Sequence, residues 1–331
     1  MTTATIVFRC DASPDIGLGH LIRCMAVAAK LVDRQVVFAM AADASGKTVT
    51  DAGYRLLLKH DAEDEGMFLR RVKTELSPAA IVLDRKYDYS SGFVGELKKG
   101  CRVVIFDNFC DGLESCDAAV FPNAHLDTPL LSRHLASGSF GKVKWGFDYV
   151  ILRDAIVRLK GLRRPGNKPP RLVITMGGSD PAGMTLKIME MLKDRELNAH
   201  ITVLTGDSFK HRSSLAALAG SLPGNFSIVD YTPKALIDAD FAICAFGMSI
   251  YEMIYLGIPA VCVSHSTENA HGARILRERY PGIEDIGQID GVTPEALYYA
   301  ITEIMNASKT LPAPIDGDGA RRAAKAVEGD D

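Results

Sequence analysis

The sequence predicts an α/β protein with two doubly wound parallel sheets. Short β-branched and apolar runs alternate along the chain with stretches long enough for a crossover helix, which is typical of parallel sheets covered on both faces. The chain has 331 residues, more than one ordinary hydrophobic core holds and enough for two. Apolar residues make up 47% of it, so both cores can be filled.

The expected strands share a run of apolar residues that ends at a polar or glycine-containing segment. In the first half they are TIVFRC (5–10), QVVFAMA (35–41), YRLLLK (54–59), AAIVLD (79–84), RVVIFD (102–107) and AAVFPN (118–123). In the second half they are RLVITM (171–176), ITVLTG (201–206), FSIVDY (226–231), FAICAF (241–246) and AVCVSH (260–265).

The break between the halves lies in KGLRRPGNKPPR, which is rich in Pro, Gly and positive charge. We expect an N-terminal Rossmann-like domain over 1–160, a linker over 161–170 and a C-terminal Rossmann-like nucleotide-binding domain over 171–310. A polar tail with a short helix is expected over 311–331. Ligands of such sheets bind outside the carboxyl ends of the strands, so two domains facing each other would form a central ligand cleft.

Residues 15–20, DIGLGH, place a histidine where a glycine-rich turn opens into an amphipathic helix. Gly17 and Gly19 allow a sharp turn and a close approach of the backbone to a ligand. The positive end of a helix disfavours imidazolium, so we expect His20 to be neutral near pH 7 and suited to act as a general base. The alternative is that His20 only satisfies exposed N–H groups of the first helical turn.

A second glycine turn follows the strand in RLVITMGGSDPAGMT. Ser179 and Asp180 are candidate N-caps, and Pro181 suits the first helical position. Free N–H groups at such a helix start, beside Gly177 and Gly178, suit phosphate oxygens. The alternative is a capped helix that binds nothing.

Two further strand ends carry polar residues. In FAICAFGMSIYEMIYLGIP, Ser249 and Glu252 have the spacing of a capping box, which is a sufficient structural reason for both. Alternatively, Ser249 and nearby N–H groups hold a diphosphate and Glu252 accepts hydrogen bonds from ribose hydroxyls. In AVCVSHSTENAHGARIL, the Asn269 amide both donates and accepts, which suits hydroxyl or amide recognition.

Composition excludes several classes of protein. The net charge is −3 and long basic runs are absent, so a nucleic-acid partner is not expected. The seven cysteines form no CxxC or zinc spacing and the acidic residues are scattered, so we expect no metal and no cofactor. GxGH lacks the third glycine of a nicotinamide fingerprint. The start MTTATIVFRCD lacks the pattern of a signal peptide, and the cysteine usage is typical of a cytoplasmic protein. The sequence is also compatible with a monomer.

The longest apolar stretch, FAICAFGMSIYEMIYLGIPAVCV, has the length of a membrane span. Glu252, two glycines and Pro259 interrupt it, and β-like runs form both of its ends. We therefore interpret it as strand, turn, helix, turn and strand, and expect no membrane span.

FRCDASPDIGLGHLIRCMAVA resembles the opening of the UDP-sugar hydrolases of pseudaminic acid synthesis and their spore-coat polysaccharide relatives, which pairs R-x-D-A-S with I-G-x-G-H and R-C. Later segments are similar to further motifs of that family, in the same order: VIFDN, SCDAAVFPN, WGFDYVILRDAI, MGGSDPAGMT, YEMIYLGIPAV, TEN and IDGDGARRAAKAV. The resemblance covers nearly the whole chain. The family is related to glycosyltransferase family 28.

The resemblance implies a GT-B fold and metal-independent, inverting hydrolysis of a UDP-2,4-diacetamido-2,4,6-trideoxyhexose. UDP and a free sugar for nonulosonic-acid or surface polysaccharide synthesis would be released, and His20 would activate the water. The implied nucleotide- and phosphate-binding residues are Gly177, Gly178, Ser179, Gly247, Met248, Ser249 and Glu252. The implied substrate-binding residues are Arg9, Asp11, Gly17, Gly19, Asp84, Asn108, Arg153 and Asn269, with Arg9 and Asp11 also ordering the loop around His20.

Three segments depart from the family pattern. Phe246 and Met248 are bulky where the family has A-G-G-S-T, DRKYDYS displaces Tyr87 by one position, and Ala270 replaces a common glutamine. Two other functions therefore fit the same residues. One is a glycosyltransferase whose acceptor enters where the hydrolase admits water, and the other is a non-catalytic nucleotide-sugar-binding protein.

Overall fold

The structure is a computed structural model that describes residues 4–13, 17–41, 46–136, 139–206, 209–219, 225–306 and 312–330. The chain divides into two compact units. The first comprises Met1–Arg153 and Gly317–Asp331, and the second comprises Asp154–Asp316. The division falls before the expected linker, which lies inside the second unit, and the C-terminal helix belongs to the first unit.

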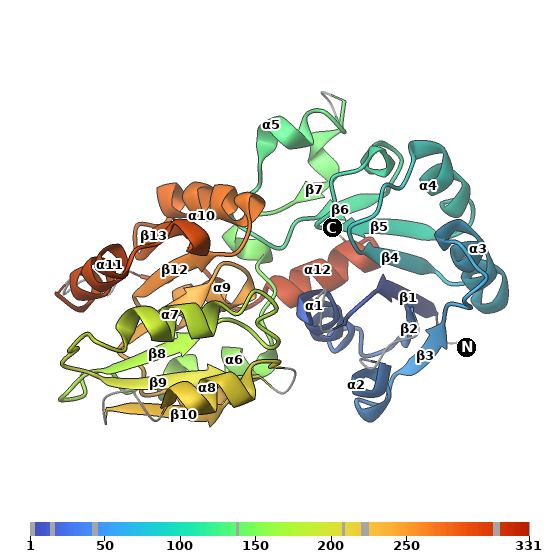
Figure 1. The fold of residues 1–331 in the computed structure, drawn as a ribbon. Helices are drawn as coiled ribbons and strands as arrows, with labels where there is room; N and C mark the ends of the chain where they lie inside the picture. Colours follow the sequence, from blue (N-terminus) through green and yellow to red (C-terminus); the bar gives the residue numbers. More distant parts are fainter. Residues whose placement is uncertain are drawn as a thin grey trace. The chain divides into compact units, whose positions relative to one another are not determined.

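The first unit is built on a seven-stranded sheet of order β3-β2-β1-β4-β5-β6-β7, in which all neighbouring strands are parallel (Figure 1). The strands are β1 (Thr5–Cys10), β2 (Gln35–Met40), β3 (Arg55–Leu58), β4 (Ala80–Asp84), β5 (Arg102–Phe106), β6 (Ala118–Val120) and β7 (Val143–Lys144). Strand β7 was not expected, because two residues carry no alternating pattern.

Helices cover both faces of this sheet. They are α1 (Gly19–Ala28), α2 (Gly46–Asp51), α3 (Glu65–Leu76), α4 (Ser91–Leu97), α5 (Thr128–Leu131) and α12 (Gly319–Glu328). Alternate residues of β1 point to opposite faces. Phe8 therefore packs in the layer that contains α1 and α12, whereas Val7 packs in the layer that contains α3 and α4. Helix α12 contacts α1, so the two ends of the chain build one core.

The second unit has a six-stranded parallel sheet of order β10-β9-β8-β11-β12-β13. Its strands are β8 (Arg171–Thr175), β9 (His200–Thr205), β10 (Phe226–Asp230), β11 (Phe241–Ala245), β12 (Ala260–Ser264) and β13 (Ile283–Gln288). Its helices are α6 (Asp154–Val157), α7 (Met184–Leu192), α8 (Arg212–Ala219), α9 (Met248–Leu256), α10 (Thr267–Arg279) and α11 (Pro294–Asn306).

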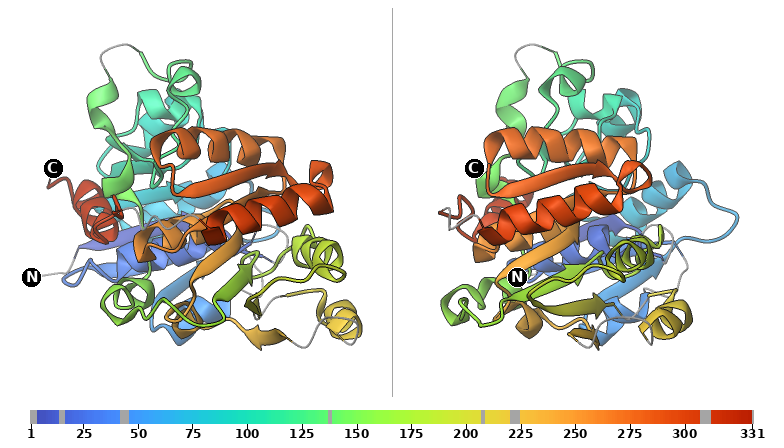
Figure 2. Two further views of the ribbon diagram at one scale, coloured as in Figure 1. Left: turned by 90° about the vertical axis from the view of Figure 1, so that its left-hand side faces the viewer. Right: turned by 60° about the vertical axis from the view of Figure 1, so that its left-hand side comes forward.

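Consecutive elements lie next to one another at one edge of this sheet. Helix α10, strand β13 and helix α11 are in contact and run side by side in Figure 2. Strand β13 was not expected, because IEDIGQ mixes two acidic residues into its apolar pattern. The predicted fold class, two doubly wound parallel α/β domains, is confirmed.

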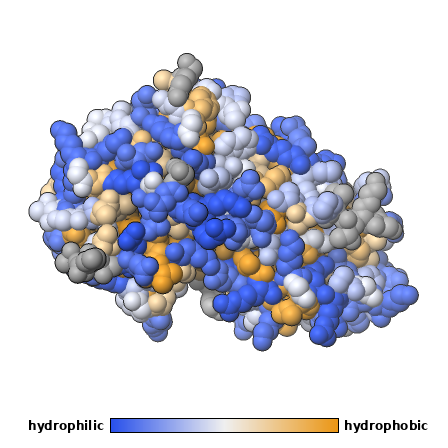
Figure 3. Space-filling view, turned by 180° about the vertical axis from the view of Figure 1, so that it is seen from behind, coloured by the Kyte–Doolittle hydropathy of each residue, from blue (hydrophilic) through white to orange (hydrophobic). Residues whose placement is uncertain are grey.

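The stretch with the length of a membrane span folds as β11, α9 and β12, as predicted. Across the described part of the chain, every helix is too short or too polar to traverse a bilayer. Seen from behind in Figure 3, the visible surface is mostly hydrophilic, and its apolar side chains form small separate patches.

The predicted start of the first helix after β8 is wrong. Helix α7 begins at Met184, and Pro181 lies in the preceding turn. Asp180 and Gly183 have φ angles of 42° and 62°, which interrupt a helical path. The Asp180 carboxylate nevertheless caps the helix, because it accepts from the N–H groups of Met184 and Thr185 at 2.9 and 2.8 Å.

Candidate active site

The carboxyl edge of the first sheet gathers polar side chains. Strands β1, β4, β5 and β6 are parallel and adjacent, so their carboxyl ends meet at one edge. Asp84 ends β4, while Asp11, Asp107 and Asn123 follow β1, β5 and β6. This is the edge at which α/β sheets bind ligands.

His20 lies in the first turn of α1, directly beside this edge. Gly17, with φ of 85°, makes the turn before the helix and donates its N–H to Ser13 O at 2.7 Å. Gly19 is the first helical residue, and a Cβ there would meet open space. The N-cap residue of α1, Leu18, makes no side-chain cap hydrogen bond. The imidazole places Nδ1 2.6 Å from Asp84 Oδ1, with 19% of the side chain exposed.

The Asp84 carboxylate determines which imidazole nitrogen carries the proton. Burial opposes ionisation of Asp84, which is 0% exposed, but the Arg23 guanidinium and the His20 hydrogen bond hold its pKa well below the usual range. An ionised carboxylate only accepts, so Nδ1 of His20 donates to it. In the neutral imidazole, Nε2 then carries the lone pair and can take a proton.

Arg23 connects the ends of β4 and β5. Its Nε donates to Asp84 Oδ2 at 2.7 Å, its Nη2 donates to Asp84 Oδ1, and its Nη1 donates to Asp107 Oδ2 at 2.9 Å. Arg23 and Asp107 were not predicted from the sequence as site residues. The signals were the R-C that follows I-G-L-G-H, which places Arg23 one helical turn after His20, and the Asp of VIFDN.

Arg9 and Asp11 form part of a buried network beneath the edge. Arg9 is 0% exposed and donates to Asp11 Oδ1 at 2.5 Å and to Glu65 Oε1 at 2.9 Å. Asp11 also accepts from the N–H of Ala41 at 2.8 Å. The guanidinium of Arg9 thus has no surface to offer a substrate, and the pair is placed to hold the loop after β1.

The other residues expected to bind substrate lie in different surroundings. Asn108, 4% exposed, donates its amide to Tyr87 O at 2.6 Å and so holds the loop after β4. Arg153 is half-buried and is the last residue of the first segment of its unit. Asn269 lies in the first turn of α10, where its N–H and Oδ1 make a reciprocal cap with the Ser266 hydroxyl at 3.2 and 2.8 Å.

Two glycine turns meet at the carboxyl edge of the second sheet. Strands β8 and β11 pair in parallel, so the turn of Gly177, Gly178 and Ser179 neighbours the turn of Gly247. A Cβ on Gly206, which follows β9, would lie 2.2 Å from Gly178 O, so only glycine fits there. The expected phosphate-binding segments therefore lie together.

The capping box predicted at α9 is wrong. Gly247, with φ of 151°, is the N-cap, and Ser249 lies inside the helix. Gly247 has no side chain and therefore makes no side-chain cap hydrogen bond to the first N–H groups of this helix. Glu252 is 4% exposed and accepts from the Tyr231 hydroxyl at 3.1 Å.

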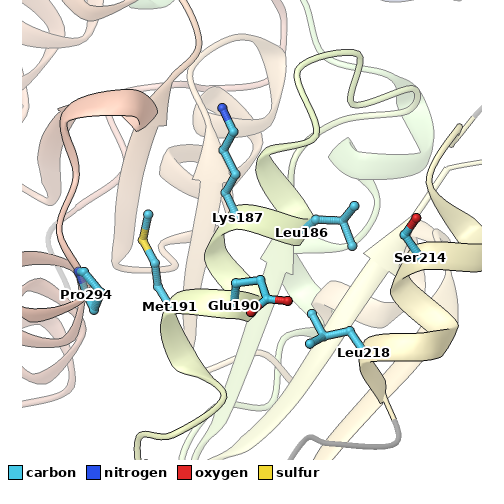
Figure 4. A pocket seen from close by; sticks show the side chains of 7 residues that line it. All are labelled: Leu186, Lys187, Glu190, Met191, Ser214, Leu218 and Pro294. Carbon is cyan, nitrogen blue, oxygen red and sulfur yellow. The ribbon is translucent and has the colours of Figure 1, made fainter.

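A groove of about 580 Å³ lies elsewhere on the second unit (Figure 4). It is lined by Leu186, Lys187, Glu190, Met191, Ser214, Leu218 and Pro294, from α7, α8 and α11. None of the residues predicted to bind substrate or nucleotide lines it. The described residues also include no cluster of three or more His, Cys, Asp or Glu arranged to hold a metal ion.

Two doubly wound units of this topology define the GT-B glycosyltransferase fold, which solved structures share. MurG of Acinetobacter baumannii superimposes with a TM-score of 0.66 at 17% identity, over 98% of this chain and 99% of MurG. Spinosyn rhamnosyltransferase SpnG, solved with the spinosyn aglycone, superimposes with a TM-score of 0.61 at 14% identity, over 99% and 96%. At these identities the likeness concerns the fold.

Among curated proteins, the chain is similar to the spore coat polysaccharide biosynthesis protein SpsG of Bacillus subtilis, with 21% identity over 310 residues, 89% of this chain and 87% of SpsG. It is also similar to the uncharacterised protein MJ1062 of Methanocaldococcus jannaschii, with 25% identity over 264 residues, 76% of this chain. That match spans 54% of MJ1062, about half its length. No family model matches the chain.

Proposed function

We propose that this chain transfers the sugar of a nucleotide-diphosphate sugar to a hydroxyl acceptor, with His20 as the general base. The observation that carries the proposal is the 2.6 Å contact between His20 Nδ1 and Asp84 Oδ1, which leaves Nε2 free to accept a proton. Two findings support this class. SpnG, which shares the fold, is named a rhamnosyltransferase and has been solved with thymidine diphosphate, and SpsG is named for polysaccharide biosynthesis.

In this mechanism Nε2 removes the proton of the acceptor hydroxyl as its oxygen attacks the anomeric carbon. The bond between that carbon and the diphosphate oxygen breaks, and attack from the opposite side inverts the configuration. The buried Asp84 carboxylate stabilises the imidazolium that forms. In the second unit, backbone N–H groups at the start of α9, from Gly247 to Ser249, are our candidates for binding the diphosphate, with Gly177, Gly178 and Ser179 beside them. Glu252 would accept from the ribose hydroxyls.

Hydrolysis is the second candidate, with water in place of the acceptor. The resemblance of the R-C-D-A-S and I-G-L-G-H motifs to UDP-sugar hydrolases of pseudaminic acid synthesis favours it. The substrate would then be a UDP-2,4-diacetamido-2,4,6-trideoxyhexose. The same base and the same leaving group serve both reactions, so the acceptor distinguishes them.

A panel of UDP-, TDP-, CMP- and GDP-sugars, with and without added sugar acceptors, tests the proposal. Nucleotide release and the anomeric proton signals of the product are followed by NMR. Release that requires an acceptor supports transfer, and release in water alone supports hydrolysis. Tight binding without release would identify a non-catalytic binding protein, and an absence of binding across the panel would contradict the whole class.

His20→Asn tests the base. We expect turnover to fall by about a hundredfold or more, the usual scale for a lost general base, with little change in nucleotide affinity. His134→Asn is the matched control, because His134 also pairs with an aspartate, Asp111, at 3.1 Å but on the exposed surface. Turnover in His20→Asn equal to that of the control would remove His20 from the mechanism.

Nucleotide preference is best tested at Met248. Phe246 is 7% exposed, so shortening it would open a cavity and destabilise the unit by about 3–5 kcal/mol. Met248 is half-buried and begins α9. Met248→Ser should therefore change the ranking of nucleotide sugars without a comparable loss of stability, and an unchanged ranking would show that this turn does not contact the ligand.

A further inference from the structure

We propose that Arg23 and Asp107 are positioning residues for His20. They act through Asp84 and hold the imidazole in the form that carries its proton on Nδ1, so that Nε2 is the atom that takes a proton. This inference rests on the proposed function in one respect, namely that Nε2 of His20 takes up a proton during the reaction. The arrangement of the side chains is a separate claim with its own measurement.

Asp84 has little freedom to turn. Its Oδ1 contacts His20 Nδ1 and Arg23 Nη2, while its Oδ2 accepts from Arg23 Nε at 2.7 Å and from Cys24 Sγ at 3.1 Å. The residue is 0% exposed, so these protein groups rather than bulk solvent surround its carboxylate. The orientation of the carboxylate, and with it the acceptor presented to His20, depends on Arg23.

Arg23 is held at both ends of its planar guanidinium. The edge formed by Nε and Nη2 binds Asp84, and Nη1 binds Asp107 Oδ2 at 2.9 Å. Only 11% of the side chain is exposed. A planar fork with two carboxylate partners at the ends of different strands has one orientation that satisfies both.

Asp107 has a backbone φ of 45°, an uncommon conformation for a residue other than glycine. Its N–H donates to Val120 O at 2.9 Å, and its Oδ1 accepts from Asn123 Nδ2 at 3.1 Å. Lys86 Nζ donates to its carbonyl oxygen. Such strain persists where neighbouring contacts over-determine it, and it concentrates at functional sites.

The consequence for His20 follows from donor and acceptor chemistry. Arg23 Nη2 also lies 2.9 Å from His20 Nδ1, but a guanidinium has no lone pair to accept a proton from it. The Nδ1 proton therefore goes to Asp84 Oδ1. Without Arg23, Asp84 is free to rotate away and the imidazole can adopt either neutral form, of which only one presents a lone pair at Nε2.

The test is long-range ¹H–¹⁵N NMR on protein labelled at histidine, which distinguishes the two neutral imidazole forms. The chain has 8 histidines, and the His20 signals are identified by their absence in His20→Asn. We expect the native protein to show Nδ1 protonated, and Arg23→Gln and Asp107→Ala to show a mixture or the opposite form. A native His20 protonated on Nε2 would overturn the proposal whatever the enzyme's activity.

Kinetics provide the second arm. In Arg23→Gln and Asp107→Ala, kcat should fall by roughly tenfold to a hundredfold with KM little changed, since small misplacements of a reacting group cost up to about a hundredfold. Asp107→Asn should recover most of the rate, because an amide oxygen still accepts from Arg23 and asparagine tolerates a positive φ. Unchanged kcat and an unchanged imidazole form in both variants would refute the proposal.

Arg70→Gln is the matched control. Arg70 belongs to the same unit and also binds one carboxylate through two nitrogens, Glu96 at 2.7 Å each, but that pair is exposed. Far-UV circular dichroism confirms folding of each variant. If Arg23→Gln does not fold, the two Asp107 variants decide the question alone. If no nucleotide sugar is turned over, the proposed function fails while the NMR measurement still decides this inference.

Discussion

Glu65 offers the sharpest test of the network beneath the candidate site. It is 5% exposed and accepts from Arg9 Nε at 2.9 Å, Arg9 Nη2 at 3.0 Å and the Tyr89 hydroxyl at 2.8 Å, with Arg85 Nη1 as a further donor. Glu65→Gln keeps the shape of the side chain but removes its charge. One of its two oxygens becomes an NH₂ group that faces donors.

The expected loss follows from these contacts. Removing one partner of a buried ion pair costs about 3–5 kcal/mol, because the remaining charge is left uncompensated. Asp11 still binds Arg9 at 2.5 Å and neutralises part of that charge. We therefore expect Glu65→Gln to lower the free energy of unfolding of the first unit by about 3 kcal/mol, at the lower end of that range.

Urea unfolding followed by tryptophan fluorescence measures this loss. The chain has 1 tryptophan, Trp145, which packs against the same apolar layer as α3, so the signal reports on the first unit. Glu75→Gln is the control, because Glu75 is on the same helix but its pair with Arg71, at 3.3 Å, is exposed, and such pairs contribute about 0–1 kcal/mol. Equal losses in both variants would refute the reasoning. A raised KM without lost stability would instead point to substrate contact by Arg9.

Three further predictions concern stability and reactivity. Burial opposes ionisation of Asp107, but Lys86 and Arg23 lower its pKa to about 2. The ionised carboxylate should therefore add about 2 kcal/mol to the free energy of unfolding above pH 4, and this stability should be lost as the pH falls through about 2. In an acid titration of stability, Asp107→Asn should lack this loss. Gly206→Ala should lower the melting temperature and weaken nucleotide binding, because the new Cβ would lie 2.2 Å from a backbone oxygen. Gly161→Ala is the control and should do neither, because a Cβ at Gly161 would meet open space. Burial raises the pKa of the Cys101 and Cys116 thiols to about 11, so iodoacetamide at pH 8 should modify them only after unfolding; rapid modification of the native protein would contradict their burial.

The local pattern of the sequence was sufficient for the fold class and for most strands. Apolar runs separated by helical stretches predicted both sheets, and the glycine turn placed His20 in the first turn of α1. The pattern failed where a strand was too short, as at β7, or interrupted by acidic residues, as at β13. It also failed at the starts of α7 and α9. Positive φ angles at Asp180 and Gly183 interrupt the helical path before α7, which begins at Met184, and Gly247 is the N-cap of α9, so that Ser249 lies inside that helix.

The composition of the candidate site was decided by the tertiary structure. His20 and Asp84 are separated by 64 positions, and Asp107 lies further along the chain. They meet because β1, β4 and β5 are neighbours in the sheet, an order that no local periodicity encodes. Likewise, only the packed structure shows that Arg9 is buried and that α12 completes the first unit. Residue types and spacing determine helices, strands and turns through local sterics and hydrogen bonding, whereas the pairing of charges across strand ends depends on which strands the whole core brings together.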